Sequence, residues 1–315
     1  MTKVSILVPT YNRAGFLREA LQSAVRQTHS DLEILILDDA SPDATVAVAA
    51  EFADDPRVQY LRQPANVGIA ENWRAGIGRA QGSFFCLLHD DDTFEPAFIE
   101  TLLGPLLADP ALLFSFCDHW VMDDAGKRMP DATNDASRRF HRTLLSPGTH
   151  QEWAELALIF AGIPVGATLF RRDKVSPAFV DARAKGAVDA WLFYQCAKSG
   201  LGAYYTKERL MNYRLHGGGM SRSSLYMGEG HIFRWQQILA DSQMAPLHPQ
   251  VRHQLAQALT SYGIDLLVEN RRQEAQQSLK HALALQKSRR TALAYGLACG
   301  GPVGMKIAQK LRSAS

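Results

Sequence analysis

The stretch SFFCLLHDDD, residues 83–92, is the segment from which the rest of the chain can be interpreted. Its apolar run is rich in aromatic residues, too short for a helix and bounded by Gly82, which predicts a buried strand. The strand delivers His89 and three consecutive aspartates to its carboxyl end. Three adjacent carboxylates repel one another, so they must be solvated in a turn or share a hard divalent cation. Ligands of open α/β sheets bind outside the carboxyl ends of the strands, which favours the cation.

Further apolar runs alternate with segments of helical spacing. Continuous apolar residues predict strands at 4–8, 33–37 and 58–61, and helical spacing predicts helices at 16–27, 45–52 and 72–80. Strands separated by helices indicate an α/β fold with a mostly parallel sheet covered on both faces. Polar side chains follow the carboxyl ends of these strands; they are Thr10, Tyr11, Asn12, Arg13, Asp38, Asp39, Asn66 and Asn72.

The middle of the chain continues this pattern and then becomes irregular. We expect a helix over 96–107, a strand over 111–121 and another strand over 164–170. Residues 128–148 are polar and poor in periodicity, so they are predicted to form a mobile surface loop, and long loops near an active face often act as lids.

Two isolated residues are candidates for chemistry. Asp189 stands in the first turn of a predicted amphipathic helix that ends at Gly200, where an acid is often only a helix cap. His216 precedes a run of three glycines, and that flexible run would let it close on a bound ligand, although a lone histidine is commonly structural. The residues alone leave both alternatives open.

From about residue 226 the pattern is helical only. Residues 228–243 predict one helix, and 250–269 with 272–287 predict a helical hairpin. The tail, 289–315, is basic and amphipathic. Such a tail can lie on an anionic membrane surface or form a helix that caps the domain, and both interpretations stay open.

Composition excludes several classes of protein. The chain has 315 residues, 46% hydrophobic content and a formal net charge of +2, which is too mild for a surface devoted to nucleic acid. Its four cysteines are far apart and read as reduced core residues rather than disulfides or a zinc site. The N-terminus lacks a signal-peptide cleavage site, and no apolar stretch is long enough to span a membrane. We therefore expect a cytoplasmic protein, either soluble or peripheral at the inner face of the membrane.

Five motifs together resemble a known family. In chain order they are VSILVPTYNR, ILILDDASPD, NVGIAENWRAGIGRAQGSFFCLLHDDD, VDAWLFYQCAKSG and YRLHGGGMS. Their order and spacing closely resemble the family 2 glycosyltransferases of the GT-A fold. The resemblance covers roughly residues 3–225. It implies a GT-A domain over 1–225. The helices expected over 226–315 fall outside the resemblance and form a separate all-α region.

The resemblance also implies roles for individual residues. It implies nucleotide contacts from Pro9, Thr10, Tyr11, Arg13, Asp38, Asp39, Asn66, Gly68 and Asp90. It implies an Mg²⁺ or Mn²⁺ ion held by Asp91, Asp92 and His216, with Asp189 as the general base. The family's usual pattern has an acid where this chain has His89, and another where it has Val188. The three aspartates allow two registers of the family's DXD motif, one with Asp90 and Asp92 as its acids and one with Asp91 as the main metal ligand. We favour the second, with Asp90 at the ribose.

The activity that the resemblance implies is inverting sugar transfer. The donor would be a UDP-, dTDP- or GDP-sugar, and the acceptor a polysaccharide, a lipid-linked glycan or a glycan on protein. A nucleotide-sugar-binding pseudoenzyme that recruits a partner is the alternative, but a pure binder has no need of both Asp91 and Asp189. Nucleotidyl transfer is a third hypothesis, and PTYNRAGF matches a phosphate-binding glycine loop poorly.

Overall fold

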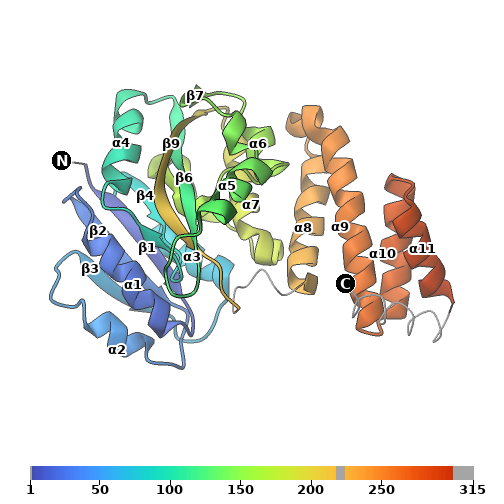
Figure 1. Ribbon diagram of the computed structural model, residues 1–315, viewed down its shortest axis with the longest axis horizontal. Helices are drawn as coiled ribbons and strands as arrows, with labels where there is room; N and C mark the ends of the chain where they lie inside the picture. The colour runs from blue at the N-terminus through green and yellow to red at the C-terminus, as the bar shows by residue number, and fades with distance from the viewer. Residues whose placement is uncertain (1, 218–223, 301–315) are drawn as a thin grey trace. The chain divides into compact units, whose positions relative to one another are not determined.

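The computed structural model describes residues 2–217 and 224–300 (Figure 1). The chain divides into two compact units, one of residues 1–182 with 189–217 and one of residues 183–188 with 218–315. The first unit contains the β-sheet, and the second contains α8 (Ser224–Ala240) and the helices after it. The domain boundary predicted after residue 225 falls in the first turn of α8 and stays a prediction.

The sheet of the first unit is mixed, and the first four strands of the chain form a parallel part of it. Its order is β3-β2-β1-β4-β8-β6-β9-β5, and β7 pairs with β9. The strands β3, β2, β1 and β4 are mutually parallel, whereas β8 runs antiparallel to both of its neighbours. The bounds are β1 (Val4–Thr10), β2 (Leu32–Asp38), β3 (Val58–Arg62), β4 (Phe84–Leu87), β5 (Thr93–Phe94), β6 (Leu112–Met122), β7 (Gly148–His150), β8 (Thr168–Arg171) and β9 (Gly202–Arg214).

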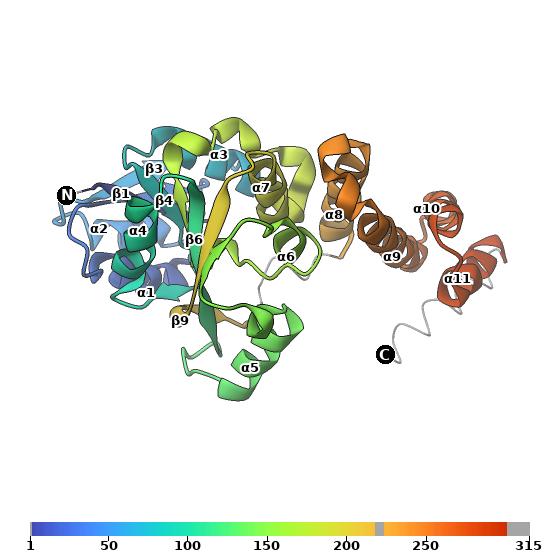
Figure 2. The same cartoon turned by 90° about the horizontal axis from the view of Figure 1, so that it is seen from above.

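Helices cover both faces of this sheet, as Figures 1 and 2 show. Along β1, Val4, Ile6 and Val8 share one core cluster with residues of α1, α2 and α4, because alternate side chains of a strand point to the same face. The predicted α/β class with helices on both faces is confirmed. The helices of this unit are α1 (Ala14–Val25), α2 (Thr45–Ala50), α3 (Ile69–Arg79), α4 (Phe98–Ala108), α5 (Pro130–Arg139), α6 (Ala154–Leu158) and α7 (Val188–Ala197).

The opposite face is packed with aromatic rings. Phe114 lies 5.6 Å from Phe170, 5.6 Å from Phe193 and 4.7 Å from Trp153, measured between ring centroids. Phe85 of β4, the strand that precedes the three aspartates, stacks on Phe170 with 5.2 Å between the ring centroids. The carboxyl end of β4 is therefore built on a rigid layer, which suits a site that must hold side chains in fixed positions.

The prediction that residues 128–148 form an irregular loop is wrong. Pro130 begins α5 at a position where its missing N–H costs nothing, and a short 3₁₀ turn follows at Arg142–Leu144. The inner face of α5 is polar: the Thr133 hydroxyl accepts from the Val121 amide at 2.9 Å, and the Ser137 hydroxyl donates to Asp118 at 2.6 Å. Because polar groups do the packing, the helix carries no apolar period.

Replacing Arg142 with Met is expected to lower the free energy of unfolding by about 3 kcal/mol, because it leaves a buried charge uncompensated. The Arg142 Nε atom donates to Asp118 Oδ1 at 2.8 Å, and the Arg142 side chain is 1% exposed. Urea denaturation measures the loss. Arg138→Met is the control, since Arg138 pairs with Asp135 on the surface, where such pairs contribute at most about 1 kcal/mol. Equal small losses in both variants would contradict the role of the buried pair.

The described part of the second unit is helical. It contains α8, α9 (His248–Val268), α10 (Arg272–Leu285) and α11 (Arg289–Cys299), so the predicted all-α extension is present. Leu266 and Leu267 pack with Ala275 and Leu279 in a separate core, which joins α9 to α10 as a helical hairpin. Residues 301–315 of the predicted basic tail lie outside the described residues.

Candidate active site

The loops after β1 and β4 lie together because these strands are parallel neighbours, with Ile6 paired to Cys86 and Leu7 to Leu87. Both loops leave the same edge of the sheet. The Tyr11 amide approaches Asp90 Oδ2 at 3.4 Å, and Arg13 Nη1 donates to Asp90 Oδ1 at 3.1 Å. The structure thus brings two sequence motifs, 77 to 79 residues apart, into one site.

Asp90 is the inner carboxylate of this site. It is 4% exposed. Burial raises its pKa to about 6, and the neighbouring Asp91 adds to the rise, while Arg13 and Thr10 oppose it. A nearby cation or a hydroxyl donor would stabilise its charged form.

Asp91 is the carboxylate that meets most positive charge. Its Oδ2 accepts from Arg13 Nη1 at 2.5 Å and pairs with His216 Nε2 at 3.0 Å. Burial alone would raise the pKa of Asp91, but the charges of His89, His216 and Arg13 hold it below its ordinary value. Asp91 is therefore ionised, and it contacts Arg13 and His216 from two distant parts of the chain.

Asp92 is buried and already hydrogen-bonded. Its Oδ1 accepts from the Arg214 amide at 2.9 Å, and its Oδ2 lies 3.4 Å from His89 Nδ1. Burial raises its pKa, and the interactions with His89 and the Arg214 amide oppose the rise. The bond from the Arg214 amide holds the end of β9 against the turn that contains the three aspartates.

His89 interacts with all three aspartates. Although burial opposes protonation, its contact with Asp92 and the charges of Asp92, Asp91 and Asp90 raise the pKa of His89 to about 9. Its ring also stacks on Trp73 at 5.8 Å. His89 is a departure from the family pattern in sequence, and in the structure it lies within the acidic cluster of Asp90, Asp91 and Asp92.

In the metal-free protein, stability is expected to fall as the pH rises through the raised pKa of His89. Protonated His89 contributes stability that is fully present below its ordinary pKa of 6.5 and lost as the pH rises to about 9. Between these two pKa values the free energy of unfolding should fall by up to about 1.4 kcal/mol per pH unit, the value for one proton. Urea unfolding at several pH values measures it. His89→Asn should flatten the slope, and the exposed His253→Asn should not; a slope unchanged in His89→Asn would contradict the assignment.

The donor set suits a hard divalent cation. One ligand atom from each of His89, Asp91 and Asp92 lies within 4.8 Å of the others. Carboxylate oxygens are preferred by Mg²⁺ and Mn²⁺, and an imidazole nitrogen suits transition metals better than Mg²⁺. The group therefore fits a divalent ion, with Mn²⁺ favoured by the histidine.

Arg214 orders this site although sequence analysis did not select it. Its side chain is completely buried, and its Nε donates to the Asp91 carbonyl at 2.9 Å. Its Nη2 pairs with Glu19 at 2.5 Å. Successive side chains of a strand point to opposite faces, so one of the two neighbours Tyr213 and Arg214 in the YRLH motif had to face the interior. In the structure Arg214 does so, while Tyr213 is 39% exposed.

The two acids after β2 have different partners. Asp38 is fully buried, and its oxygens accept from the Ser41 amide at 2.8 Å, the Tyr60 hydroxyl at 2.5 Å and Arg62 at 2.9 Å. The carboxylate of Asp39 accepts from the amides of Val67 and Gly68 at 2.7 and 2.9 Å. Asp39 thereby joins the turn that starts α3.

The other predicted nucleotide contacts lie at the same edge. Pro9 and Thr10 end β1, paired with Leu37 and Asp38. Tyr11 is 46% exposed, and Asn66 is also exposed. Both side chains are therefore accessible to a ligand.

Asp189 lies in the first turn of α7 and is exposed, with its Oδ1 accepting from the Ala190 amide at 2.6 Å. Burial raises the pKa of Tyr213, and so do the charges of Asp92, Asp91 and Asp189. Asp189 thus acts on the same tyrosine as two aspartates about a hundred residues earlier in the chain. Its role as the general base stays a prediction.

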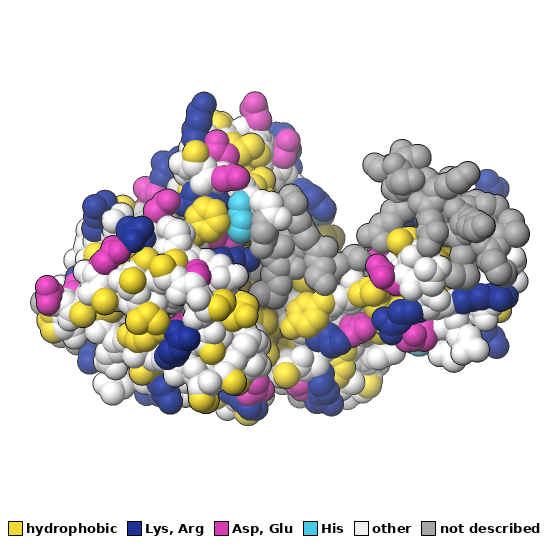
Figure 3. Space-filling model, turned by 90° about the horizontal axis from the view of Figure 1, so that it is seen from below, with side chains coloured by type: hydrophobic (Ala, Val, Ile, Leu, Met, Phe, Trp, Pro, Cys, Tyr) yellow, Lys and Arg dark blue, Asp and Glu magenta, His cyan; other side chains and the backbone are white. Residues whose placement is uncertain are grey.

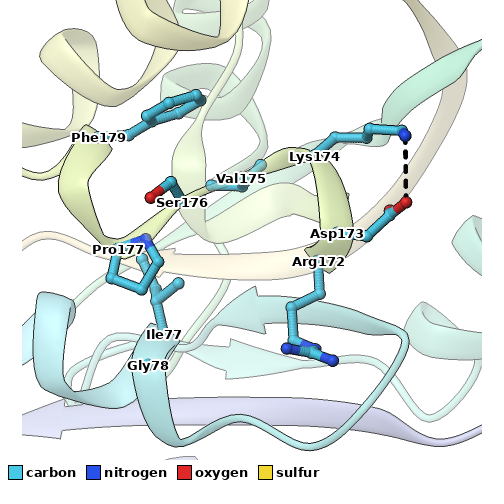
Figure 4. A pocket seen from close by; sticks show the side chains of 9 residues that line it. All are labelled: Ile77, Gly78, Arg172, Asp173, Lys174, Val175, Ser176, Pro177 and Phe179. Carbon is cyan, nitrogen blue, oxygen red and sulfur yellow. Dashed lines mark ion pairs between the residues drawn. The ribbon is translucent and has the colours of Figure 1, made fainter.

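A hollow of about 380 Å³ lies elsewhere on the first unit, between the end of α3 and residues 172–179 (Figure 4). Because α3 runs from the carboxyl end of β3 to the amino end of β4, its last turn lies at the opposite sheet edge from the acidic cluster. The charged groups there are already paired: Lys174 with Asp173 at 3.2 Å and Arg172 with the Gly82 carbonyl at 2.5 Å. Among the described residues, the side chains that could hold a metal ion lie at the carboxyl edge instead.

Charges on the face drawn in Figure 3 are interspersed, with acidic and basic side chains side by side. That face therefore has no large region of one charge sign that would attract a charged ligand over a long distance. Among the described helices, none combines the length and the apolar character needed to cross a bilayer.

A family model described as glycosyl transferase family 2 matches residues 5–176, which hold β1 to β8 and the acidic cluster. The chain belongs to this family. It is an enzyme class whose members transfer sugars, and the predicted family assignment is confirmed.

Proteins of similar sequence are named as glycosyltransferases. An uncharacterised glycosyltransferase of Escherichia coli K12, YibD, is 27% identical over 234 residues, or 70% of this chain and 63% of that protein. A Campylobacter jejuni protein named GalNAc(5)-diNAcBac-PP-undecaprenol beta-1,3-glucosyltransferase is 36% identical over 119 residues, or 37% of this chain and 38% of that protein. The matched stretch covers 20% of an uncharacterised glycosyltransferase of Rickettsia conorii.

Solved structures share the GT-A fold. Residues 1–349 of Staphylococcus aureus TarS, in complex with UDP-GlcNAc, give a TM-score of 0.64 at 15% identity, covering 99% of this chain and 92% of that one. The mannosyltransferase PcManGT from Pyrobaculum calidifontis, in complex with GDP-Man and Mn²⁺, gives 0.61 at 16% identity, covering 99% and 84%. The glycosyltransferase fold is therefore shown.

Proposed function

We propose that this glycosyltransferase moves a sugar from a nucleotide-diphosphate sugar to an acceptor hydroxyl by direct displacement. The observation that carries the proposal is the cluster of Asp90, Asp91 and Asp92 at the carboxyl edge, where ligand atoms of His89, Asp91 and Asp92 lie within 4.8 Å of one another. Displacement at a sugar carbon needs a stabilised leaving group and a base for the attacking hydroxyl. The cluster and Asp189 supply one role each.

The nucleotide would bind over the loops after β1 and β2. Pro9, Thr10 and Tyr11 would form the wall of the base pocket, with the exposed Tyr11 ring packing on the base. Asp39 would accept from the base, and the buried Asp38 would hold the loop from below. Asn66 and Gly68 border this surface, Asp90 would bind the ribose and Arg13 the diphosphate. Neighbours of this fold bind UDP-GlcNAc and GDP-Man, which supports the donor class.

The metal would be held by Asp91, with Asp92, His89 and His216 beside it. When bound, a divalent ion supplies Lewis-acid stabilisation of the leaving diphosphate. The oxygen-rich donor set favours Mg²⁺ or Mn²⁺, and PcManGT is described with Mn²⁺. Arg214 would keep the turn in place through its bonds to Asp91 and Asp92.

Asp189 would accept the proton of the acceptor hydroxyl. One displacement needs one base, whereas a double displacement needs a second, nucleophilic carboxylate close by. We therefore expect inversion, with an α-linked donor giving a β-linked product. Proton NMR of the first product formed tests this, and an α-linked product from an α-linked donor would contradict the assignment of Asp189.

The acceptor is proposed to be a polysaccharide, a lipid-linked glycan or a protein glycan. Relatives include proteins named chondroitin synthase and hyaluronan synthase of Pasteurella multocida and the undecaprenol-linked glucosyltransferase, which support a glycan acceptor. The basic residues of 289–315 are proposed to reach an anionic membrane that carries such an acceptor.

A product assay separates the proposal from its alternatives. The protein is incubated with Mn²⁺ and a panel of UDP-, dTDP- and GDP-sugars, and phosphorus-containing products are identified. The proposal predicts release of nucleoside diphosphate from one class of donor. Pyrophosphate would indicate nucleotidyl transfer, and saturable donor binding with no product in the presence of a glycan acceptor panel would favour the pseudoenzyme.

A further inference from the structure

The side chain of Arg13 lies among the three aspartates and pairs its positive charge with Asp90 and Asp91. Its Nη1 atom bridges Asp90 Oδ1 at 3.1 Å and Asp91 Oδ2 at 2.5 Å. The two carboxylates are 6% and 15% exposed, and the arginine side chain is 22% exposed. These charge-assisted contacts are therefore mostly shielded from water, where such interactions are strongest.

The same Asp91 oxygen also pairs with His216 Nε2 at 3.0 Å. An ion that binds Asp91 must share or displace these two donors. If Arg13 stayed in place, the ion would meet a guanidinium charge within a few ångströms in a low-dielectric site. A divalent ion arriving alone therefore meets occupied ligands and a like charge.

A nucleoside diphosphate removes both obstacles. It brings phosphate oxygens that a planar guanidinium binds well, so Arg13 gains another anionic partner at the same sheet edge. Its negative charge also offsets the divalent ion. Release of Asp90 and Asp91 by Arg13 would then coincide with the arrival of the ligand that needs the ion.

We propose that Arg13 is an internal counter-ion that keeps the carboxylates closed to a free divalent ion and transfers to the diphosphate when ion and nucleotide bind together. The proposal rests on the proposed metal-dependent function. It makes ion and nucleotide binding cooperative, and because such coupling is reciprocal each ligand raises the affinity for the other by the same factor.

The test measures binding rather than turnover. Mn²⁺ affinity of the full chain is measured by calorimetry and by electron paramagnetic resonance, alone and with saturating UDP, dTDP or GDP. Arg13→Met is expected to bind Mn²⁺ alone about tenfold more tightly than wild type, as loss of a shielded charge-assisted contact permits. The same variant should bind the nucleoside diphosphate about tenfold more weakly, since it loses a phosphate contact.

Opposite signs for the two ligands distinguish this role from a structural one. Arg13→Lys keeps the charge and should keep the cluster closed to Mn²⁺. Arg18→Met changes an exposed pair with Glu51 in α1, the helix that directly follows Arg13, and should alter neither affinity. Thermal unfolding of each variant confirms that it folds.

Two results would overturn the inference. Arg13→Met could bind Mn²⁺ alone no more tightly than wild type, or it could lose affinity for both ligands. Either result, obtained while wild type binds Mn²⁺ with a nucleotide, leaves the proposed function standing. Wild type that binds no Mn²⁺ with any of the three nucleotides would overturn the metal-dependent function itself, and the inference with it.

Discussion

Replacing Asp91 with Asn is expected to lower sugar transfer about a thousandfold, since a metal that stabilises a leaving group contributes several kcal/mol to the transition state. Asp91 is the ionised carboxylate to which Arg13 and His216 both point. Asparagine keeps the shape and removes the charge. Steady-state kinetics with the identified donor measures the loss, and Mn²⁺ affinity in the presence of nucleotide should fall in parallel.

Asp54→Asn is the control for this variant, because Asp54 is an exposed acid after α2 and lies outside the five motifs. It should retain full activity. Activity of Asp91→Asn within a factor of three of wild type would show that Asp91 is not the main ligand. Asp90 and Asp92 would then be the next candidates.

Replacing Asp189 with Asn is expected to lower kcat by about a thousandfold, within the range that general bases contribute. Asparagine caps a helix about as well as aspartate, so the variant removes the base and keeps the cap. Donor affinity and stability should stay near wild type. Rapid mixing followed by quantification of nucleoside diphosphate measures the chemical step.

The matched control is Asp131→Asn, since Asp131 is an exposed acid in the first turn of α5, as Asp189 is in the first turn of α7. Both variants lose the same charge at a helix start. If the two lost activity equally, or if neither did, Asp189 would be a cap and the base would have to be sought elsewhere.

The parallel half of the sheet could be predicted because its strands are continuous apolar runs separated by amphipathic helices. The antiparallel insertion of β8 between β4 and β6 could not, since pairing partners far apart in sequence leave no local pattern. Residues 164–170, expected as one strand, instead form a 3₁₀ turn at Val165–Ala167 followed by β8 (Thr168–Arg171). Local apolar character does not distinguish these two conformations.

The position of the site could also be predicted, because strand ends and acidic motifs are both visible in sequence. The partners within it could not. Nothing local indicates that Arg13 bridges two aspartates 77 and 78 residues away, or that Arg214 holds the turn from the end of β9. The role of His89 was missed because it was compared with a family pattern instead of with its spatial neighbours.

The polar inner face of α5 was the other source of error. Thr133 and Ser137 are buried and hydrogen-bonded to β6, so a helix with no apolar stripe still packs. Buried Arg142 and Asp118 extend the same polar interface. Hydrophobic periodicity cannot detect packing of this kind.

The most direct test of the account is withdrawal and return of the metal. Nucleoside diphosphate release from the preferred donor is measured in wild type after a chelator and again after graded addition of Mn²⁺. Release is expected to stop with the chelator, to return with Mn²⁺ and to stay absent in Asp91→Asn. Undiminished release in a metal-stripped protein would contradict metal-dependent transfer.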